Sequence, residues 1–264
     1  MSFRAVALSG LVPVLLLSAC GESRQPPWKA AQPKAAPAAE TRYLAAPAVA
    51  EAVVAAEGVR LSGQAAARAR VMLGTPTGET LSAVADDQGR WSVVAPTPQA
   101  VVLYGLFMLD GQRKVNAEGY LVLTPDGRAA ELRSGGGARV LATASRPPRI
   151  LAIDFDRDGG AVVSGVGTAG ADLGLRIDRN AGGTAMVSDA GRFALVLMRP
   201  LPQGEHEFEV AGEGGEDSVT VAIRRADPLG EAVYRATAVG GGWRIDWRTP
   251  GGGVQTTLLT DRRG

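Results

Sequence analysis

This 264-residue chain has few of the side chains that usually carry chemistry, with one cysteine, Cys20, and one histidine, His206. A single cysteine forms no disulfide within the chain, and a zinc site needs several thiolates or imidazoles. A single histidine without a supporting motif gives no Ser-His-Asp arrangement. Lysine occurs only at positions 29, 34 and 114, and the net charge is +1 with acidic residues interspersed. This pattern lacks the basic footprint of a nucleic-acid-binding protein.

The first residues have the features of an export signal. Arg4 gives a positive start, and the apolar stretch 5–17 has the length of a signal-peptide core, too short to span a bilayer permanently. The stretch ends in the letters LSAC at Cys20, which resembles the lipobox of bacterial lipoproteins. The resemblance implies removal of residues 1–19 and acylation of Cys20 with chains such as palmitate. The alternatives are an ordinary signal peptide with a stray cysteine, or a short N-terminal anchor.

The lipoprotein resemblance also bears on location. Gly21 stands where the family's inner-membrane retention signal has an aspartate. The expected location is therefore the cell envelope, on the outer membrane and facing the periplasm. Lipoproteins of that family carry three acyl chains, which anchor a protein firmly where a single chain does not. Residues 20–57 follow with a Pro- and Ala-rich composition, and their prolines oppose a regular helix. We expect a disordered tether here, with a helical turn or two in the segment AVAEAVVAAEG.

One phrase occurs twice in the rest of the chain. VADDQGRWSVVAP and VSDAGRFALVLM align at an offset of 102 residues without a gap, which carries Asp87, Gly89 and Trp91 onto Asp189, Gly191 and Phe193. The same offset relates three further pairs, which are Gly63 and Gly165, Val71 and Leu173, and Leu73 and Leu175. This shared register indicates a tandem duplication.

The duplicated segments have the pattern of short β-strands. Apolar residues alternate at period two and are interrupted by Gly, Asp and Pro, and the Asp-x-Gly step of each copy suits a tight hairpin. We therefore predict an all-β fold with two β-sandwich domains at 58–145 and 149–226. Residues 227–264 are predicted to form a C-terminal β-hairpin, with its turn at Pro250 to Gly253. It either extends the second sandwich or stands as an appendage.

The second copy resembles the bacterial immunoglobulin-like domains of envelope proteins, and it is also similar to the carboxypeptidase regulatory-like β-sandwich. The resemblance rests on Gly165, Leu173, Asp189, Gly191, Arg192, Phe193, Gly204, His206, Phe208 and Val210. The first copy matches only as far as Trp91. The resemblance implies two tandem immunoglobulin-like sandwiches, and these motifs imply no catalytic residue.

Two sets of residues are candidate sites. Asp154, Asp156 and Asp158 precede Gly159 as at the start of an EF-hand calcium loop, but the twelfth position lacks the bidentate glutamate, and the alternative is a polar turn between strands. Trp243 and Trp247 share one face of a predicted strand. Exposed there, they would stack on a partner such as a glycan, and the alternative is that they cover the domain core.

Other possible sites are weaker. His206 is expected on the outer face of a strand, as a structural or solvated side chain. Glycine-rich stretches precede no predicted helix, so they are interpreted as turns rather than phosphate-binding loops. We predict no cofactor and no metal.

Two classes of function follow from these observations. The first is a non-catalytic, lipid-anchored envelope protein that braces or binds peptidoglycan, polysaccharide or another protein. The second is a glycan-acting envelope enzyme that uses a pair of carboxylates. The first class is preferred because no carboxylate pair stands out in the sequence.

Overall fold

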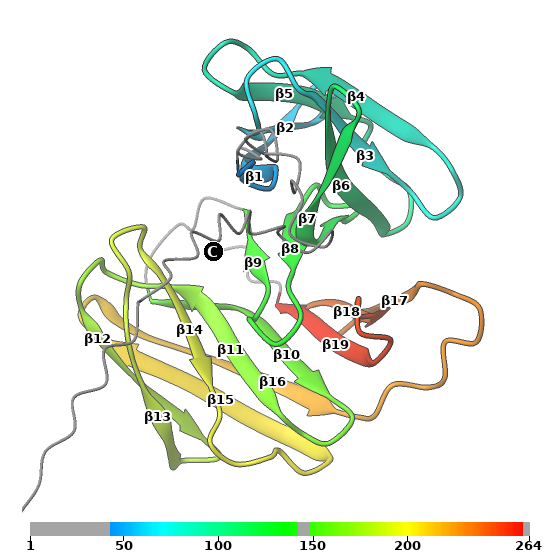
Figure 1. Ribbon diagram of the computed structural model, residues 1–264. Coiled ribbons are helices and arrows are strands. Elements are labelled where there is room, and N and C mark those ends of the chain that lie inside the picture. The colour runs from blue at the N-terminus through cyan, green and yellow to red at the C-terminus, as the bar shows by residue number, and fades with distance from the viewer. Residues whose placement is uncertain (1–42, 142–147, 261–264) are drawn as a thin grey trace, which may run out of the picture. The chain divides into compact units, whose positions relative to one another are not determined.

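The computed structural model describes residues 43–141 and 148–260 (Figure 1). Every regular element in these two ranges is a β-strand, and all strand pairs are antiparallel, which confirms the all-β prediction. No helix within the described residues is long and apolar enough to cross a membrane. The predicted signal peptide, Cys20 and most of the predicted tether lie outside the described residues.

The first sandwich consists of two sheets. The smaller sheet has the order β1-β2-β5, and the larger has the order β4-β3-β6-β7-β8-β9. Their strands are β1 (Ala48–Ala55), β2 (Gly58–Gln64), β3 (Arg70–Gly74), β4 (Thr80–Val84), β5 (Arg90–Ala95), β6 (Val102–Asp110), β7 (Arg113–Leu123), β8 (Ala129–Leu132) and β9 (Arg139–Val140). Trp91 lies in the core between the sheets, with Leu61, Leu73 and Leu121. The burial of these apolar side chains holds the two sheets together.

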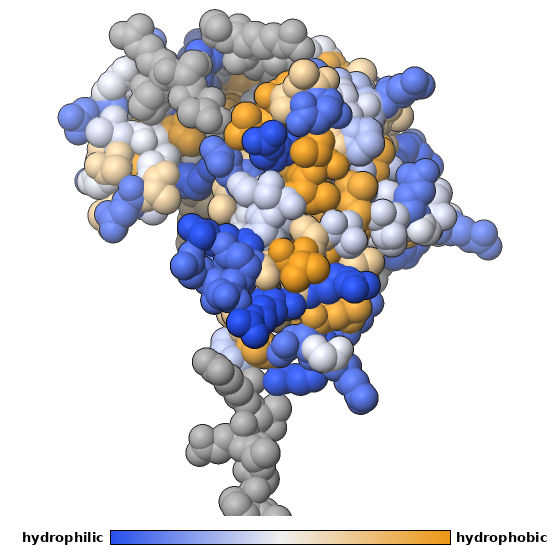
Figure 2. Space-filling model, turned by 90° about the horizontal axis from the view of Figure 1, so that it is seen from above, coloured by the Kyte–Doolittle hydropathy of each residue, from blue (hydrophilic) through white to orange (hydrophobic). Residues whose placement is uncertain are grey.

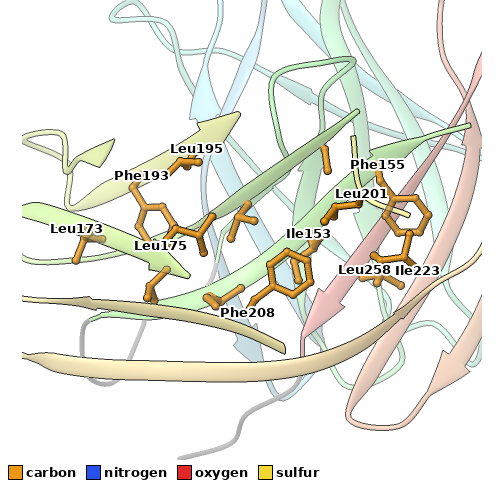
Figure 3. Close-up of a cluster of buried hydrophobic side chains, with 14 of the residues drawn as sticks. Ile153, Phe155, Leu173, Leu175, Phe193, Leu195, Leu201, Phe208, Ile223 and Leu258 are labelled. Atoms are coloured by element: carbon orange, nitrogen blue, oxygen red, sulfur yellow. The ribbon is translucent and has the colours of Figure 1, made fainter. Parts of the chain in front are cut away.

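The second sandwich repeats this arrangement. One sheet has the order β14-β11-β10-β19-β18-β17, and the other has the order β13-β12-β15-β16. The strands are β10 (Arg149–Asp156), β11 (Ala161–Val166), β12 (Asp172–Ile177), β13 (Asn180–Met186), β14 (Arg192–Val196), β15 (Gly204–Gly212), β16 (Gly215–Ile223), β17 (Tyr234–Val239), β18 (Gly242–Arg248) and β19 (Val254–Thr260). Figure 3 shows Phe193 and Phe208 pointing into the core between its sheets.

The two sandwiches are copies of one immunoglobulin-like unit. Seven strands of each copy correspond in order, β1 to β7 and β10 to β16, and each forms a three-stranded sheet over a four-stranded one. Five backbone hydrogen bonds of the turns recur at the 102-residue offset, such as Ala65 N–H to Gly89 O, which corresponds to Gly167 N–H to Gly191 O. The shared hydrogen bonds confirm in three dimensions the duplication seen in the sequence.

The glycine and the aromatic residue that recur in both copies occur together for the same structural reason. Gly63 on β2 lies opposite Trp91 on β5, and Gly165 on β11 lies opposite Phe193 on β14. A Cβ at either glycine would come within 2.9 Å of the facing ring and would overlap the carbonyl oxygen of Ala48 or Arg149. A glycine is therefore required where the ring crosses the neighbouring strand.

The Asp-x-Gly steps are tight turns, but the hairpin expected there is wrong. The turn at Gly89 leads from β4 in one sheet to β5 in the other, and the turn at Gly191 leads from β13 to β14 in the same way. Both glycines have positive φ, which the turn requires. The strands on either side separate because the apolar residues of β5 and β14 complete the sheet opposite. Asp86 rather than Asp87 caps the first turn, since its Oδ1 accepts the backbone N–H groups of Gln88 and Arg90.

The last part of the predicted tether is structured. The segment expected to form a helical turn or two is strand β1, which pairs with β2 and buries Val49 in the first core. The segment forms a strand rather than a helix because β1 supplies hydrogen-bond partners to the backbone of β2 along its full length. The sandwich therefore begins at Ala48, inside the range 20–57 that was predicted to be disordered.

The C-terminal strands extend the second sandwich rather than standing apart. Strands β18 and β19 form the predicted hairpin, closed by hydrogen bonds between Thr249 and the Gly252–Gly253 backbone. Strand β19 also pairs with β10, and β17 pairs with β18 (Figure 1). The hairpin is thus part of a six-stranded sheet that contains three strands of the duplicated unit.

Strands β8, β9, β18 and β19, which lie outside the duplicated unit, pack with strands of both copies and join the two sandwiches. A third hydrophobic core contains Leu132 and Val140 from β8 and β9, Leu103 and Val122 from β6 and β7, and Ala152, Ile245, Trp247 and Leu259 from β10, β18 and β19. We call this core the joint. Each copy thus contributes a sheet face that a single immunoglobulin-like unit would leave exposed.

A buried polar network lies within the joint. Asp154, on β10, accepts hydrogen bonds from the Ala138 N–H at 2.6 Å, the Thr257 hydroxyl at 2.5 Å and the Gln255 amide at 3.2 Å. Burial raises the pKa of Asp154 to about 6, and these hydrogen bonds oppose the rise. Trp247 Nε1 donates to the Thr257 hydroxyl at 3.1 Å, which links the indole to the network. A buried carboxyl group is tolerated here because several donors surround it.

Candidate binding sites

A groove runs along one side of the second sandwich, with a volume of about 710 Å³. One wall is strand β16, and the other comprises β17, β18 and β19, on the face opposite to the joint. Both β16 and β17 are the last strands of their sheets, so each has an outer edge without a strand partner. Such edges can accept an extended chain by strand addition.

Arginine dominates the charge of this groove. Arg224, Arg225, Arg235 and Arg244 line it together with Glu205, Asp227 and Asp246. Arg244 is held at 2.9 Å from Asp246, and Arg235 lies 3.8 Å from Asp227. The Arg224 and Arg225 side chains are exposed and form no ion pair within the described residues. The groove therefore offers two cations to a partner and suits acidic or hydrogen-bonding groups.

Exposed hydrophobic side chains are spread over the part of the chain that the structure describes. The large ones come from several separate segments and are Tyr43, Val53, Val54, Val84, Met186, Val196, Met198 and Val239. On the face in Figure 2, hydrophobic residues are bordered and interrupted by hydrophilic ones. Scattered exposed hydrophobic residues are normal for a folded surface.

The two tail tryptophans have different environments. Trp247 has 0% of its surface exposed and packs edge-on against Tyr120 at 5.8 Å between ring centroids. It therefore occupies the core, the alternative considered for it, and presents no ring face to a partner. Trp243 is partly buried against the joint, and its Nε1 donates to Asp126 at 3.3 Å. Its partly exposed ring lies on the joint face of β18, opposite to the groove.

The three aspartates of the calcium candidate do not come together. Asp154 faces the joint, whereas Asp156 closes the turn between β10 and β11 by accepting the N–H groups of Asp158 and Gly160. Both residues have the same parity on β10, but Asp156 ends the strand and its carboxylate is used in the turn, away from the buried position of Asp154. No group of three His, Cys, Asp or Glu within the described residues is arranged to hold a metal ion. The polar-turn alternative describes this segment.

His206 faces inward, so its expected placement on the outer face is wrong. It has the same parity on β15 as Phe208 and Val210, and only 7% of its surface is exposed. Nδ1 lies 2.7 Å from Asp178 Oδ2, and Nε2 lies 3.0 Å from the carbonyl oxygen of Pro202. The pKa of Asp178 is lowered by the Glu207 N–H and by the His206 hydrogen bond. His206 thus has the structural role that the sequence allowed.

The sequence contains only part of the signal for the groove. Alternation along GWRIDWR placed Arg244 and Asp246 on one face, and that face lines the groove. Arg224, Arg225 and Arg235 come from other segments and meet Arg244 only because β19 inserts beside β10. No local pattern indicates that long-range pairing.

Comparison with known proteins gives little further information. No protein-family model and no curated protein matches the chain. Among solved structures, the chain is similar to one described as "Biofilm associated protein - BSP domain", at 20% sequence identity and a TM-score of 0.24. The similarity covers 70% of this chain and 30% of that structure's length.

Proposed function

We propose that this chain is a non-catalytic, lipid-anchored module of the cell envelope, which binds or braces a partner through the groove between β16 and β17–β19. The observation that supports this proposal most is the groove itself, with two arginines that lack carboxylate partners among the described residues. The partner is a peptidoglycan, polysaccharide or protein component that presents acidic or hydrogen-bonding groups.

The anchor follows from the sequence. In the proposal, acylated Cys20 attaches the chain to the outer membrane, facing the periplasm, and residues up to Ala48 connect the lipid to the first strand. The joint supports a bracing role, because it packs the two sandwiches against each other with a buried core. A partner bound at the second sandwich is then connected to the membrane through packed structure rather than a free linker.

A glycan-acting enzyme is the alternative, and the groove favours binding over it. Glycoside hydrolysis needs two carboxyl groups that face the substrate. Of the three acidic groups in the groove, Asp246 and Asp227 each lie beside an arginine, which leaves Glu205 as a single carboxylate without an ion pair among the described residues. Asp154 has a raised pKa of about 6, as a general acid would, but it is enclosed in the joint and does not line the groove.

Site-directed crosslinking tests this proposal. Thr237→Cys places a thiol in the groove, and Thr184→Cys places one on the exposed strand β13 outside it. If Cys20 is acylated, each variant has a single free thiol for a photoactivatable maleimide. We expect a crosslinked partner in isolated envelopes from position 237 and not from position 184. Equal adducts from both positions, or none, would contradict a role for the groove.

The same preparations address the alternative. Incubation of the purified protein with peptidoglycan or envelope polysaccharide, followed by measurement of new reducing ends, should give no turnover. Turnover that is lost in Asp227→Asn or Glu205→Gln would instead establish the enzyme.

A further inference from the structure

A second, smaller cavity lies where the two sandwiches meet. Its volume is about 150 Å³, and it is enclosed by the loop before β9 on one side and by β11 and β14 on the other. Arg133 and Arg139 come from the first sandwich, and Arg192 comes from the second. No acidic side chain lines this cavity. We call it the arginine cavity.

Comparison of the two copies shows why Arg192 has no carboxylate partner in its turn. Its counterpart at the 102-residue offset is Arg90, whose Nε lies 2.8 Å from Asp86 Oδ2 in the exposed turn of the first copy. The counterpart of Asp86 is Ser188, which bonds the Arg192 backbone through its hydroxyl but has no charge. The backbone of the turn is therefore preserved, and the ion pair is lost.

Without that partner, the Arg192 side chain points toward the first sandwich. Its Nη1 donates to the carbonyl oxygen of Val140 at 2.7 Å, and it forms no ion pair with a carboxylate of the described residues. Burial and the charge of Arg139 lower the pKa of Arg192, and Glu131 opposes this effect only partly. A partly buried guanidinium beside a second one is unfavourable unless an anion neutralises them.

The neighbouring groups do not balance this charge. Glu131 is bound to Arg139 at 2.8 Å and also accepts the N–H of Val49, so it is shared within the first sandwich. Arg133 is exposed and has no ion pair among the described residues. Arg133 also lies near Asp154, and its charge opposes the rise in the pKa of that carboxyl group, so the three arginines keep an excess charge of about +1 when Glu131 and Asp154 are both ionised. A phosphate group near neutral pH supplies negative charge to balance this excess.

We propose that the arginine cavity binds a phosphate group, held by Arg192 of the second sandwich together with Arg139 and Arg133 of the first. Guanidinium groups suit this ligand because their N–H donors match the oxygens of phosphate in pairs. The small volume limits the bound part to the phosphate group itself, either as a free ion or at the end of a larger molecule. Bound phosphate would connect the two sandwiches electrostatically, next to the hydrophobic joint.

The test uses the full-length mature chain, with inorganic phosphate as the probe. Thermal stability is measured as phosphate replaces chloride at constant ionic strength and pH, and calorimetric titration gives the affinity. We expect the melting temperature of the wild-type protein to rise with phosphate, because a ligand of the native state stabilises it by mass action. Arg192→Gln should weaken binding by about tenfold or more, the effect of losing one charge-assisted hydrogen bond.

Two further variants keep the test decisive. Arg90→Gln removes the equivalent arginine of the first copy, which lies outside the cavity, and should leave phosphate binding unchanged. Ser188→Asp restores in the second copy the carboxylate that pairs with Arg90 in the first. It should fold, because Asp86 fits the same turn, and it should weaken phosphate binding by drawing Arg192 into an ion pair.

The outcomes decide first whether the cavity binds phosphate through Arg192, and then which molecule supplies the phosphate group. No response of the wild-type protein to phosphate, or an equal response in Arg192→Gln, Ser188→Asp and wild type, overturns the proposal. Vesicles of phosphatidylcholine with and without phosphatidic acid then distinguish the source of the group. Retention on phosphatidic acid that depends on Arg192 identifies a lipid headgroup as the ligand. Binding of inorganic phosphate alone identifies the free ion.

Discussion

The Thr257 hydroxyl lies 2.5 Å from Asp154 Oδ1, and this hydrogen bond joins β19 to β10 inside the joint. The hydroxyl has one proton to donate, so it gives that proton to Asp154 and accepts the indole N–H of Trp247. Asp154 also receives the Ala138 N–H from the loop of the first sandwich. One carboxyl group thus connects the C-terminal hairpin, the second sandwich and the first.

Asp154 gives the protein a distinct dependence of stability on pH. Burial raises the pKa of Asp154 to about 6 from an ordinary value of 3.8, so the native state binds the proton more tightly than the unfolded state. The resulting stabilisation is full below pH 3.8 and is lost as the pH rises through 6. At 1.36 kcal/mol per pKa unit, the loss is about 3 kcal/mol as an upper limit.

Comparison of wild type with Asp154→Asn measures this contribution. Asparagine does not titrate, so the difference in unfolding free energy between the two proteins should change between pH 4.5 and 7.5, in favour of the variant at higher pH. Urea unfolding at several pH values gives the two curves. Parallel curves over this range would show that Asp154 titrates normally.

Two tryptophan-to-phenylalanine substitutions should differ in cost. Trp91 is 3% exposed, and its Nε1 is buried without a hydrogen-bond partner among the described residues. Trp247 donates its Nε1 to Thr257. Trp91→Phe removes a buried donor that has no hydrogen bond, and the second copy already has Phe193 at this position. We therefore expect the free energy of unfolding to fall by less than about 1 kcal/mol. Trp247→Phe removes this hydrogen bond and leaves the Thr257 hydroxyl oxygen without the indole donor. The free energy of unfolding should therefore fall by about 2–3 kcal/mol. Chemical denaturation of both variants decides the order.

The glycine beneath each aromatic ring should be intolerant of a methyl group. Gly165→Ala would force Cβ against the Phe193 ring and the Arg149 carbonyl oxygen, so we expect destabilisation of about 3 kcal/mol. Gly174→Ala, in the same sandwich, is the matched control, because its nearest contact to a Cβ is 3.9 Å. The control should be neutral or slightly stabilising. Similar melting temperatures for the two variants would contradict the assigned role of Gly165.

Cys20→Ser tests the predicted anchor. A serine at this position has no thiol to carry the lipid, so the variant should remain unprocessed or be released in soluble form. Membrane fractionation and metabolic labelling with radioactive palmitate provide the measurement. Continued labelling, or unchanged recovery of a processed form with the outer membrane, would argue against lipid attachment at Cys20.

The sequence predicted those features that depend on local pattern. The duplication, the all-β class and the C-terminal hairpin follow from alternation, turn residues and a common offset. These are properties of neighbouring residues, and tertiary contacts reinforce them rather than reverse them. The inward position of His206 could also have been predicted, because it shares the parity of Phe208.

The features that the sequence did not predict depend on distant pairing. The segment of β1 was predicted as the end of a Pro- and Ala-rich tether with a helical turn or two, because alanine favours helix, and only its pairing with β2 makes it a strand. The groove and the joint arise when β19 enters beside β10, from about 100 residues away. The role of Arg192 emerges only when Asp86 and Ser188 are compared at equivalent positions.

The position of β19 also determines the order in which the chain can fold. Strand β10 is complete at Asp156, yet its neighbour on one side is supplied only by Val254–Thr260. Until those residues are available for pairing, the second sandwich lacks Leu258 in its core, and the joint lacks Leu259. One edge of β10 therefore stays open until the C-terminal residues of the described chain are available. Pairing at such sequence separation is intrinsically slow, so we expect this exposed edge to be a point at which chaperones engage the newly made protein.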